Sequence, residues 1–150
     1  RGVINSIYID TESLSVHNAE LQKMYAEVRA NEQMWEEYKL EDAEYVITAF
    51  GTVARIAKSA IDQLREEGIK VGLVRPITVW PFPYDAVKKA ACADGVKAVL
   101  DVELNEGQML EDVKLAINGA KPVDFFGHLG SEMPTTDEIV AKIKSMKEGM

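Results

Sequence analysis

The sequence predicts an α/β domain, a three-layer α/β/α sandwich in which helices cover both faces of a mostly parallel sheet of about five strands. Two observations predict it. From residue 44 onward, short apolar runs rich in β-branched residues alternate with segments whose apolar residues recur at helical spacing. The connections between them are short, as in sheets built from repeated strand–helix units. The order of the strands cannot be read from this pattern.

The first strand–helix unit is the clearest. Residues 45–50 form a β-rich run, and a turn at Gly51 follows, with Thr52 as the expected helix N-cap. The helix is expected to stop at Gly68, in the C′ position that favours glycine. Its apolar stripe consists of Val53, Ile56, Ala57, Ala60, Ile61 and Leu64.

Three more strands, each followed or preceded by a helix, complete the domain. The last helix opens with a capping box made by Thr135 and Glu138. Three prolines within residues 75–83 force an extended loop. The expected strands are 70–74, 96–102 and 122–126, and the expected helices are 84–92, 108–118 and the one that begins after Thr135.

The first 40 residues differ from this pattern, so we expect an N-terminal arm with an amphipathic helix at 1–40 and the α/β domain at 41–150. Residues 4–9 alternate enough for a short edge strand or an extended arm. The helix either covers its own sheet or packs on a neighbour. Its apolar face is expected to carry Leu21, Met24, Tyr25, Val28, Trp35 and Tyr38.

Composition narrows the class of protein. The net charge of −8 argues against nucleic acid and anionic membranes as partners, because phosphate binding needs a basic face. One cysteine, Cys92, allows no internal disulfide and no cluster held by several cysteines of this chain. It is expected to be a buried small hydrophobe. We expect a cytoplasmic protein. The start lacks an initiator methionine, as in a cut-out domain or a processed chain.

Acidic residues gather after the strand at 96–102. Asp101 and Glu103 point the same way and Glu106 follows in a turn, at the strand end where open α/β sheets bind ligands. Their oxygens could hold Mg²⁺ or Ca²⁺. We favour a hydrogen-bonded loop and helix start instead, and predict no catalytic, cofactor-binding or metal-binding residue.

Two other features, the histidines and the turn at Gly51, carry weaker signals. His17 and His128 have no nucleophile or carboxylate at a telling spacing, so ordinary roles are favoured over proton transfer. The turn at Gly51 could bind an anion with free N–H groups, but it lacks a complete phosphate-binding motif, and a tight turn is favoured.

The proline-rich loop supplies candidates for an interface. Arg75 either anchors a carboxylate across an interface or pairs with an acid of its own domain. Trp80, Phe82 and Tyr84 lie around the three prolines and make a rigid apolar loop that is either a lid on the core or an interface patch, and we favour the interface. The residues predicted to lie at an interface or beside a pocket are Arg75, Trp80, Phe82, Glu103, Asn105 and Gln108.

Several segments, in their order and spacing, resemble one family. They are EDAEYVI at 41–47, FGT at 50–52, LREEGIKVGL at 64–73, RPIT at 75–78, WPFP at 80–83, ELNEGQM at 103–109 and EDV at 111–113. Together they resemble the C-terminal, transketolase C-terminal-like domain of the α-type subunit of 2-oxoacid:ferredoxin oxidoreductases, most closely the 2-oxoisovalerate branch. The similarity covers nearly the whole chain.

The resemblance implies a function for the whole assembly rather than for this chain. The family converts a 2-oxoacid and CoA to acyl-CoA, CO₂ and reduced ferredoxin, using thiamine diphosphate, Mg²⁺ and iron–sulfur clusters. The implied partners are the remainder of the α-type subunit, a thiamine diphosphate-binding subunit, an iron–sulfur subunit and ferredoxin. This chain would be structural and interfacial, and inactive alone.

Two rival hypotheses remain open at this point. The chain could be a standalone regulatory or adaptor domain with a flavodoxin-like shape, or a small enzyme that binds a phosphorylated ligand at the Gly51 turn. The sequence does not fix the 2-oxoacid, since pyruvate and 2-oxoglutarate rival 2-oxoisovalerate, and it does not fix the oligomeric state.

Overall fold

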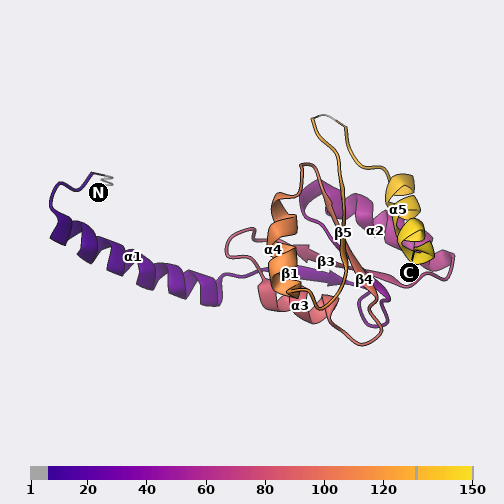
Figure 1. The fold of residues 1–150 in the computed structure, drawn as a ribbon, viewed down its shortest axis with the longest axis horizontal. Coiled ribbons are helices and arrows are strands. Elements are labelled where there is room, and N and C mark those ends of the chain that lie inside the picture. Colours follow the sequence, from indigo (N-terminus) through magenta and orange to yellow (C-terminus); the bar gives the residue numbers. More distant parts are fainter. Residues whose placement is uncertain (1–6, 131, 150) are drawn as a thin grey trace.

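The computed structural model describes residues 7–130 and 132–149. A five-stranded sheet in the order β1-β3-β2-β4-β5 forms its centre (Figure 1). The strands are β1 (Trp35–Tyr38), β2 (Tyr45–Thr48), β3 (Val71–Pro76), β4 (Ala98–Glu103) and β5 (Val123–Gly127). The helices are α1 (Thr11–Asn31), α2 (Gly51–Glu66), α3 (Tyr84–Ala91), α4 (Gln108–Ile117) and α5 (Thr136–Glu148).

Helices cover both faces of this sheet, which confirms the predicted three-layer sandwich. Strands β2 to β5 are parallel, and β1 is antiparallel to β3. Alternate residues of β4 enter two separate cores: Leu100 packs in the core under α2 and α5, and Val99 in the core under α3 and α4. Because both faces are buried, the central strands read as continuous apolar runs.

The strand order creates one switch point. From β2 the chain moves to β3 on one side, and then returns across the sheet to β4 on the other side of β2. The carboxyl ends of β2 and β4 therefore open onto connections that diverge, which is where open α/β sheets form crevices. The four parallel strands follow the flavodoxin-like order. The strand order alone therefore does not distinguish a transketolase C-terminal-like domain from a flavodoxin-like one.

The N-terminal prediction was partly wrong. The helix ends at Asn31 rather than continuing through Tyr38, and Trp35 and Tyr38 lie instead on the edge strand β1. The strand is held by its pairing with β3 and by Glu36, which binds Lys58 of α2 and Arg75 of β3. These contacts are tertiary, so the helical spacing of the aromatic residues was misleading.

Helix α1 points away from the sheet (Figure 1). None of its 21 residues, all within the described part of the chain, is buried. The alternative in which this helix covers its own sheet is therefore wrong. Residues 4–6 of the predicted edge strand or arm lie outside the described residues, and 7–9 do not join the sheet. The boundary between 40 and 41 stays a prediction.

The ends of the helices follow local rules with one exception. Gly68, at a φ of 80°, terminates α2 as predicted, and Thr135 with Glu138 forms the predicted capping box of α5. Thr52 is not an N-cap. Gly51 adopts a φ of 58° and starts the helix two residues earlier than expected, so that Phe50 is the N-cap residue.

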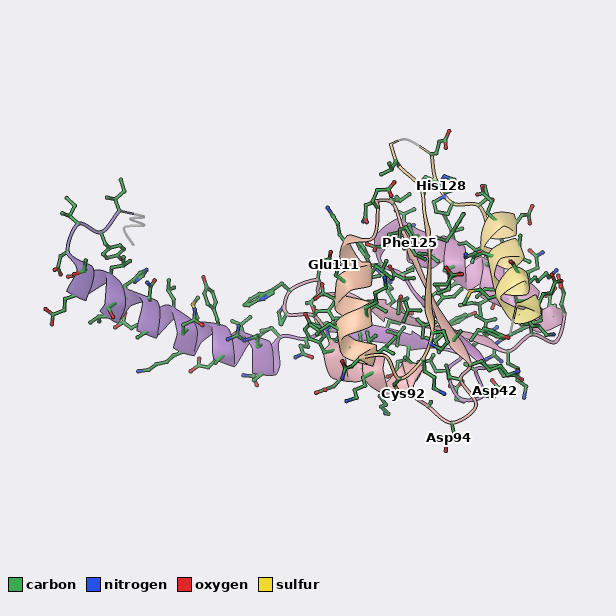
Figure 2. All side chains as sticks on the ribbon, viewed as in Figure 1. Asp42, Cys92, Asp94, Glu111, Phe125 and His128 are labelled. Carbon is green, nitrogen blue, oxygen red and sulfur yellow. The ribbon has the colours of Figure 1, made fainter. Side chains whose placement is uncertain are left out.

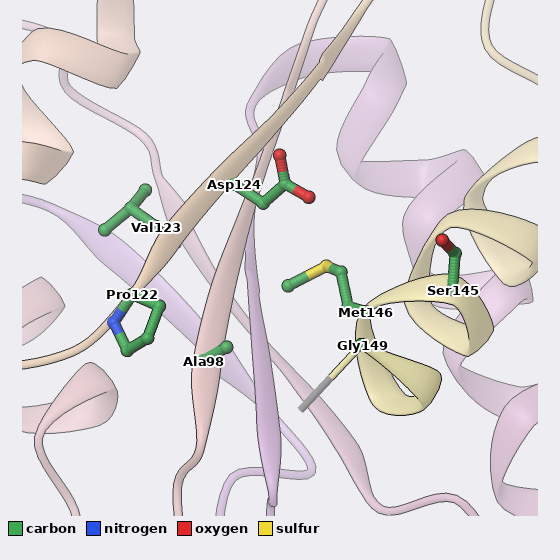
Figure 3. A pocket seen from close by; sticks show the side chains of 7 residues that line it. All are labelled: Ala98, Pro122, Val123, Asp124, Ser145, Met146 and Gly149. Carbon is green, nitrogen blue, oxygen red and sulfur yellow. The ribbon is translucent and has the colours of Figure 1, made fainter.

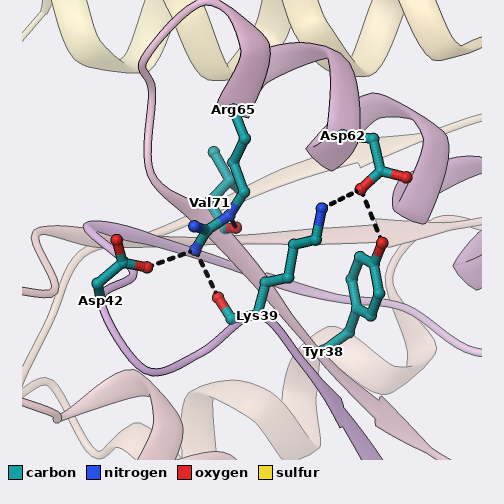
Figure 4. Close-up of polar contacts among 6 residues, drawn as sticks. All are labelled: Tyr38, Lys39, Asp42, Asp62, Arg65 and Val71. Carbon is teal, nitrogen blue, oxygen red and sulfur yellow. Dashed lines mark hydrogen bonds and ion pairs between the residues drawn. The ribbon is translucent and has the colours of Figure 1, made fainter.

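Arg65 fastens the end of α2 to the strands beneath it (Figure 4). Its guanidinium donates to the carbonyl oxygens of Val71 and Lys39, each at 2.7 Å, and to the carboxylate of Asp42 at 2.8 Å. Lys39 and Tyr38 in turn both bind Asp62 of α2. The planar fork of arginine serves three acceptors at once, which the single ammonium of lysine cannot reproduce.

We therefore expect Arg65→Lys to lower the free energy of unfolding by about 1–3 kcal/mol, because the partly buried carbonyls of Val71 and Lys39 lose their donor. Urea denaturation followed by far-UV circular dichroism measures the change. Arg55→Lys, at an exposed position of the same helix, is the control. Equal stability of the two variants would show that the Arg65 contacts contribute little.

Candidate functional site

The candidate site lies at the carboxyl edge, which we define as the loops that follow the parallel strands: residues 49–50, 77–83, 104–107 and 128–135. Figure 2 labels His128 at this end of the molecule and Asp94 at the opposite end. At the switch point a pocket of about 260 Å³ opens between two of these loops, 49–50 and 77–83, the end of β4 and the start of α4. It is lined by Phe50, Val79, Phe82, Glu103, Gln108, Met109 and Asp112.

Glu103 is the buried acid at the base of this pocket. Its side chain is only 1% exposed. One carboxylate oxygen accepts from the backbone N–H of Met109 at 3.0 Å and from Asn105 Nδ2 at 2.9 Å, and the other accepts from the N–H of Leu110 at 3.0 Å. A negative charge is thus placed against the positive end of the α4 dipole and satisfies two of its free donors.

Asn105 completes the helix start. Its Oδ1 accepts from the N–H groups of Gly107 at 2.7 Å and Gln108 at 2.9 Å. Gly107 adopts a φ of 95°, which only glycine reaches without strain, and so turns the chain into α4. The neighbouring loop is just as tight, because a Cβ on Gly127 would lie 2.5 Å from the carbonyl oxygen of Asn105.

Asp101 lies on the same face of β4, two residues before Glu103, and is fully buried. Its Oδ1 accepts a 2.6 Å hydrogen bond from the hydroxyl of Thr48 on β2, while its Oδ2 has no partner. Burial, followed by the proximity of Glu103, raises the pKa of Asp101 to about 8, against the opposing effects of Thr48 and Lys114. Asp101 is therefore a neutral carboxylic acid at pH 7.

These contacts decide between the two interpretations of the acidic cluster. Glu103 is part of a hydrogen-bonded helix start, as favoured from the sequence, and its carboxylate already occupies the α4 donors that a phosphate would need. Asp101 is protonated and Glu106 is exposed in the turn. Within the described residues, no three histidine, cysteine or acidic side chains gather as a metal site. The arrangement does not fit a magnesium diphosphate.

Arg75 pairs with an acid of its own domain, which was one of the two alternatives. Its Nη1 lies 3.1 Å from Glu36 on β1. Lys58 and then Arg75 hold the pKa of the Glu36 carboxyl below its usual range. Arg75 thereby ties the antiparallel edge strand to β3.

The proline-rich loop combines a core residue with exposed ones. Phe82 is buried and packs edge-on against Tyr84, whereas Trp80 is 53% exposed and contacts only the edge of Tyr25 from α1 among the ring pairs described. A second pocket of about 300 Å³ lies between this loop and the end of α1. Asp112 accepts a hydrogen bond from the hydroxyl of Tyr84 and raises the pKa of Tyr84 to about 12.

The six predicted residues thus lie at or near the carboxyl edge of the sheet, but they do not form a single site. Glu103 and Asn105 cap α4, and Phe82, Glu103 and Gln108 line the pocket at the switch point. Trp80 belongs to the neighbouring pocket, and Arg75 is occupied by β1. Sequence reasoning missed Thr48 and Asp112, whose partners lie 53 and 28 residues away in the chain.

The histidines and the cysteine have ordinary surroundings. His17 stacks on Tyr8 beside α1, and His128 lies near Glu132 and Glu138 with its ring edge-on to Phe126. Cys92 is half-buried at the end of α3. None of these side chains belongs to the pocket at the switch point.

A further pocket of about 400 Å³ lies at the opposite edge, where β4 and β5 begin (Figure 3). It lies between the edge strand β5 and the end of α5, and Met146 and Pro122 contribute to its wall. The charged group in its lining, Asp124, is paired with Lys142 at 2.6 Å. None of the described residues that line this pocket offers an unpaired charge that could orient a substrate.

Comparison with known proteins identifies the fold family. The profile described as "pyruvate:ferredoxin oxidoreductase core domain II" matches residues 43–139, which form most of the chain. The chain belongs to this family. The matched range contains β2 to β5 and most of both cores, so family membership rests on the sandwich itself.

One relative of this core domain II chain is the ketoisovalerate oxidoreductase subunit VorB of Methanothermobacter marburgensis. The two are 40% identical over 146 residues, which cover 97% of this chain and 41% of the relative. The chain therefore spans less than half the length of that protein.

Two solved structures share the fold. A 2-oxoglutarate:ferredoxin oxidoreductase from Magnetococcus marinus, with 2-oxoglutarate, coenzyme A and succinyl-CoA bound, matches with a TM-score of 0.72 over 92% of this chain and 24% of its own, at 20% identity. A split-gene transketolase, an inactive β4 tetramer, matches with a TM-score of 0.61 over 73% of this chain and 40% of its own, also at 20% identity. The transketolase-like fold predicted from the sequence is thereby confirmed.

We expect Glu103→Gln to lower the free energy of unfolding by about 1–3 kcal/mol, because an amide nitrogen would face a backbone N–H that now donates to a carboxylate. Chemical denaturation at pH 7 measures the loss. Glu106→Gln, in the same loop but exposed, is the control and should change stability little. A neutral effect of Glu103→Gln would argue against the cap.

We also expect Asp101→Asn to flatten the dependence of stability on pH. In the native protein the folded pKa of about 8 exceeds the unfolded value, so stability falls as pH rises from about 4 to about 8 and then levels off. Asparagine keeps the shape and the acceptor for Thr48 but cannot ionise. Urea denaturation between pH 4 and pH 9 should show the variant gaining on the native protein as pH rises.

Asp124→Asn is the control for this series, since Lys142 holds the pKa of Asp124 below its usual range and its titration lies at lower pH. A native protein whose stability is level between pH 4 and pH 8 would contradict the neutral state of Asp101.

Proposed function

We propose that this chain is the structural and interfacial C-terminal domain of the α-type subunit of a thiamine diphosphate-dependent 2-oxoacid:ferredoxin oxidoreductase, acting on 2-oxoisovalerate. The observation that carries the proposal is the match of residues 43–139 to core domain II, with 40% identity to a ketoisovalerate oxidoreductase subunit over almost the whole chain. The enzyme converts the 2-oxoacid and CoA to acyl-CoA, CO₂ and reduced ferredoxin.

The structure supports a scaffolding role. The best-placed pocket for chemistry has a carboxylate at its base that is saturated by backbone donors, and a neighbouring acid that is protonated. Neither group is free to bind a diphosphate or to act as a nucleophile. In contrast, α1 is wholly unburied and the loops beside it expose large apolar side chains, as expected of a domain that packs on others.

The reactive groups of the enzyme then reside elsewhere. We propose that thiamine diphosphate, Mg²⁺ and the iron–sulfur clusters are held by the remainder of the α-type subunit, a thiamine diphosphate-binding subunit and an iron–sulfur subunit, with ferredoxin as electron acceptor. We place this assembly in the cytoplasm. Within the described residues, no helix combines the length and apolar character needed to cross a bilayer.

The direct test is a substrate panel. The purified complex that contains this chain is assayed with CoA, an artificial ferredoxin substitute and each of 2-oxoisovalerate, pyruvate and 2-oxoglutarate. We expect the highest kcat/KM with 2-oxoisovalerate. A preference for another 2-oxoacid would overturn the substrate assignment, and no 2-oxoacid oxidation at all would overturn the function.

A second experiment uses the isolated chain. Calorimetric titration of the 150-residue chain with thiamine diphosphate and Mg²⁺ should show no binding, because the α4 donors are already taken by Glu103. Micromolar affinity would contradict the scaffolding role.

A further inference from the structure

Exposed apolar side chains are concentrated at the carboxyl edge. Val79 is 59% exposed, Trp80 53% and Leu104 41%. They come from loops after different strands, β3 and β4, which the fold brings to the same edge. The exposed large side chains of these loops are Ile77, Val79, Trp80, Leu104, Leu129 and Met133.

The opposite edge and the outer surfaces of α2 to α5 lack such a cluster among the described residues. Within the described residues from β2 onward, one large exposed hydrophobic residue other than Tyr84 lies off the carboxyl edge, namely Leu115 on α4 at 66%. Scattered exposed hydrophobic residues need no explanation, whereas several on one edge mark a contact surface. The asymmetry therefore distinguishes this edge from the rest of the domain.

Hollows continue the apolar surface. The pocket at the switch point and the pocket beside α1 adjoin, because Val79, Phe82 and Asp112 line both. We call these two adjoining pockets, which lie between the end of α1 and the start of α4, the groove. Tyr25 and Trp80 are in edge contact where α1 meets this groove. The groove is thus bounded by the same exposed loop that carries Val79 and Trp80.

The formal charge in the loops of this surface has one sign. In sequence, the loops of the carboxyl edge contain Glu106 and Glu132 but neither lysine nor arginine. The first turns of the adjoining helices add further acids, Asp85 on α3, Glu111 on α4 and Asp137 and Glu138 on α5. Helix dipoles favour acids in first turns, but they do not explain why the loops themselves lack cations.

Cations gather at the other edge. Lysines directly precede or stand close before three parallel strands, Lys70 before β3, Lys97 before β4 and Lys121 before β5. The last turns of the helices add Arg65 on α2, Lys88 and Lys89 on α3, Lys114 on α4 and Lys147 on α5. At that edge Asp42 and Glu44 pair with Arg65, Lys70 and Lys97, so its cations are balanced locally. The loops of the carboxyl edge, in contrast, carry acids without lysine or arginine.

From this geometry we infer that the carboxyl edge docks a second protein surface whose centre is apolar and whose rim carries lysine and arginine. The inference rests on the proposed function, in which this domain holds an assembly together, and it names the surface and the chemistry of its partner. Apolar contact supplies the affinity, and opposite charge at the rim supplies orientation and a faster encounter.

Charge complementarity selects this occupant. A second copy of the same edge would bring Glu106 and Glu132 against like charges, which disfavours self-pairing. A small anionic ligand is disfavoured by the same acids and by the saturated carboxylate of Glu103. A partner with an apolar centre and a basic rim is complementary both to the exposed apolar side chains and to the acidic residues in the loops around them.

The test compares matched substitutions in the intact complex. Leu104→Asp, at the carboxyl edge, is compared with Leu115→Asp, on the outer face of α4, since both place a carboxylate on an exposed leucine position. Subunit dissociation is measured by native mass spectrometry and sedimentation over a dilution series. We expect Leu104→Asp to raise the dissociation constant about tenfold or more, and Leu115→Asp to change it less than about twofold.

The rim is tested by charge reversal. Glu106→Lys should weaken assembly at about 50 mM salt more than at about 500 mM salt, because exposed charges are screened at the higher concentration. Glu148→Lys, exposed near the end of α5 at the opposite edge, is the matched control and should have little effect. Thermal unfolding of each variant checks that the domain remains folded.

Assembly that is unchanged in Leu104→Asp, or pairing of this edge with a second copy of the chain, would overturn the inference. Failure of the proposed function is read separately. If the native complex oxidises none of the 2-oxoacids but still dissociates on Leu104→Asp, the function is wrong and the docking surface stands. If it oxidises 2-oxoisovalerate and Leu104→Asp assembles normally, the surface is wrong and the function stands.

Discussion

A parallel sheet must be covered on both faces, and this constraint governs what the domain has left for contact. The helices α2 and α5 seal one face and α3 and α4 the other, so the apolar interior is complete without any partner. Only the sheet edges, the loops and the projecting α1 remain available. Of these, the carboxyl edge is where a fold of this type forms crevices, and its chemistry decides between binding a ligand and binding a protein.

The position of Glu103 disfavours binding of an anionic ligand at this edge. By placing its carboxylate over the N–H groups of Met109 and Leu110, it stabilises the start of α4 and removes the anion-binding capacity that a free helix N-terminus would have. Asp101 beside it stays protonated, so the pair buries one negative charge rather than two. The same residues that fix the helix thus close the crevice to phosphates, while leaving the loops around it apolar and exposed.

Local sequence rules predicted most of the sandwich because its strands and helices are consistent with their own patterns. The apolar run at β2, the stripe of α2 and the capping box at Thr135 each carry a short-range signal. Strand β1 carries a misleading one, since Trp35 and Tyr38 have helical spacing and the strand is formed only by pairing with β3. The start of α2 was also mispredicted. Thr52 looked like an N-cap, but the helix begins at Gly51, whose φ is positive.

The site was less accessible to sequence reasoning, because its contacts join distant segments. Nothing near Arg75 indicates that Glu36, 39 residues earlier, is its partner, and nothing near Asp101 points to Thr48. The resemblance of the sequence to a family supplied what the residues alone could not, namely the proposal that the chemistry belongs to a larger assembly. The structure then adds which edge of this domain is suited to join it.

Hydrogen–deuterium exchange on the assembled complex tests this account most directly. Comparison of free and assembled chain should show slower exchange on assembly in residues 77–83 and 104–107, with no change in the loops that precede β3, β4 and β5. The claim that this edge is the contact surface would be contradicted by either of two results. One is protection confined to the loops that precede β3, β4 and β5; the other is identical exchange of residues 77–83 and 104–107 in both states.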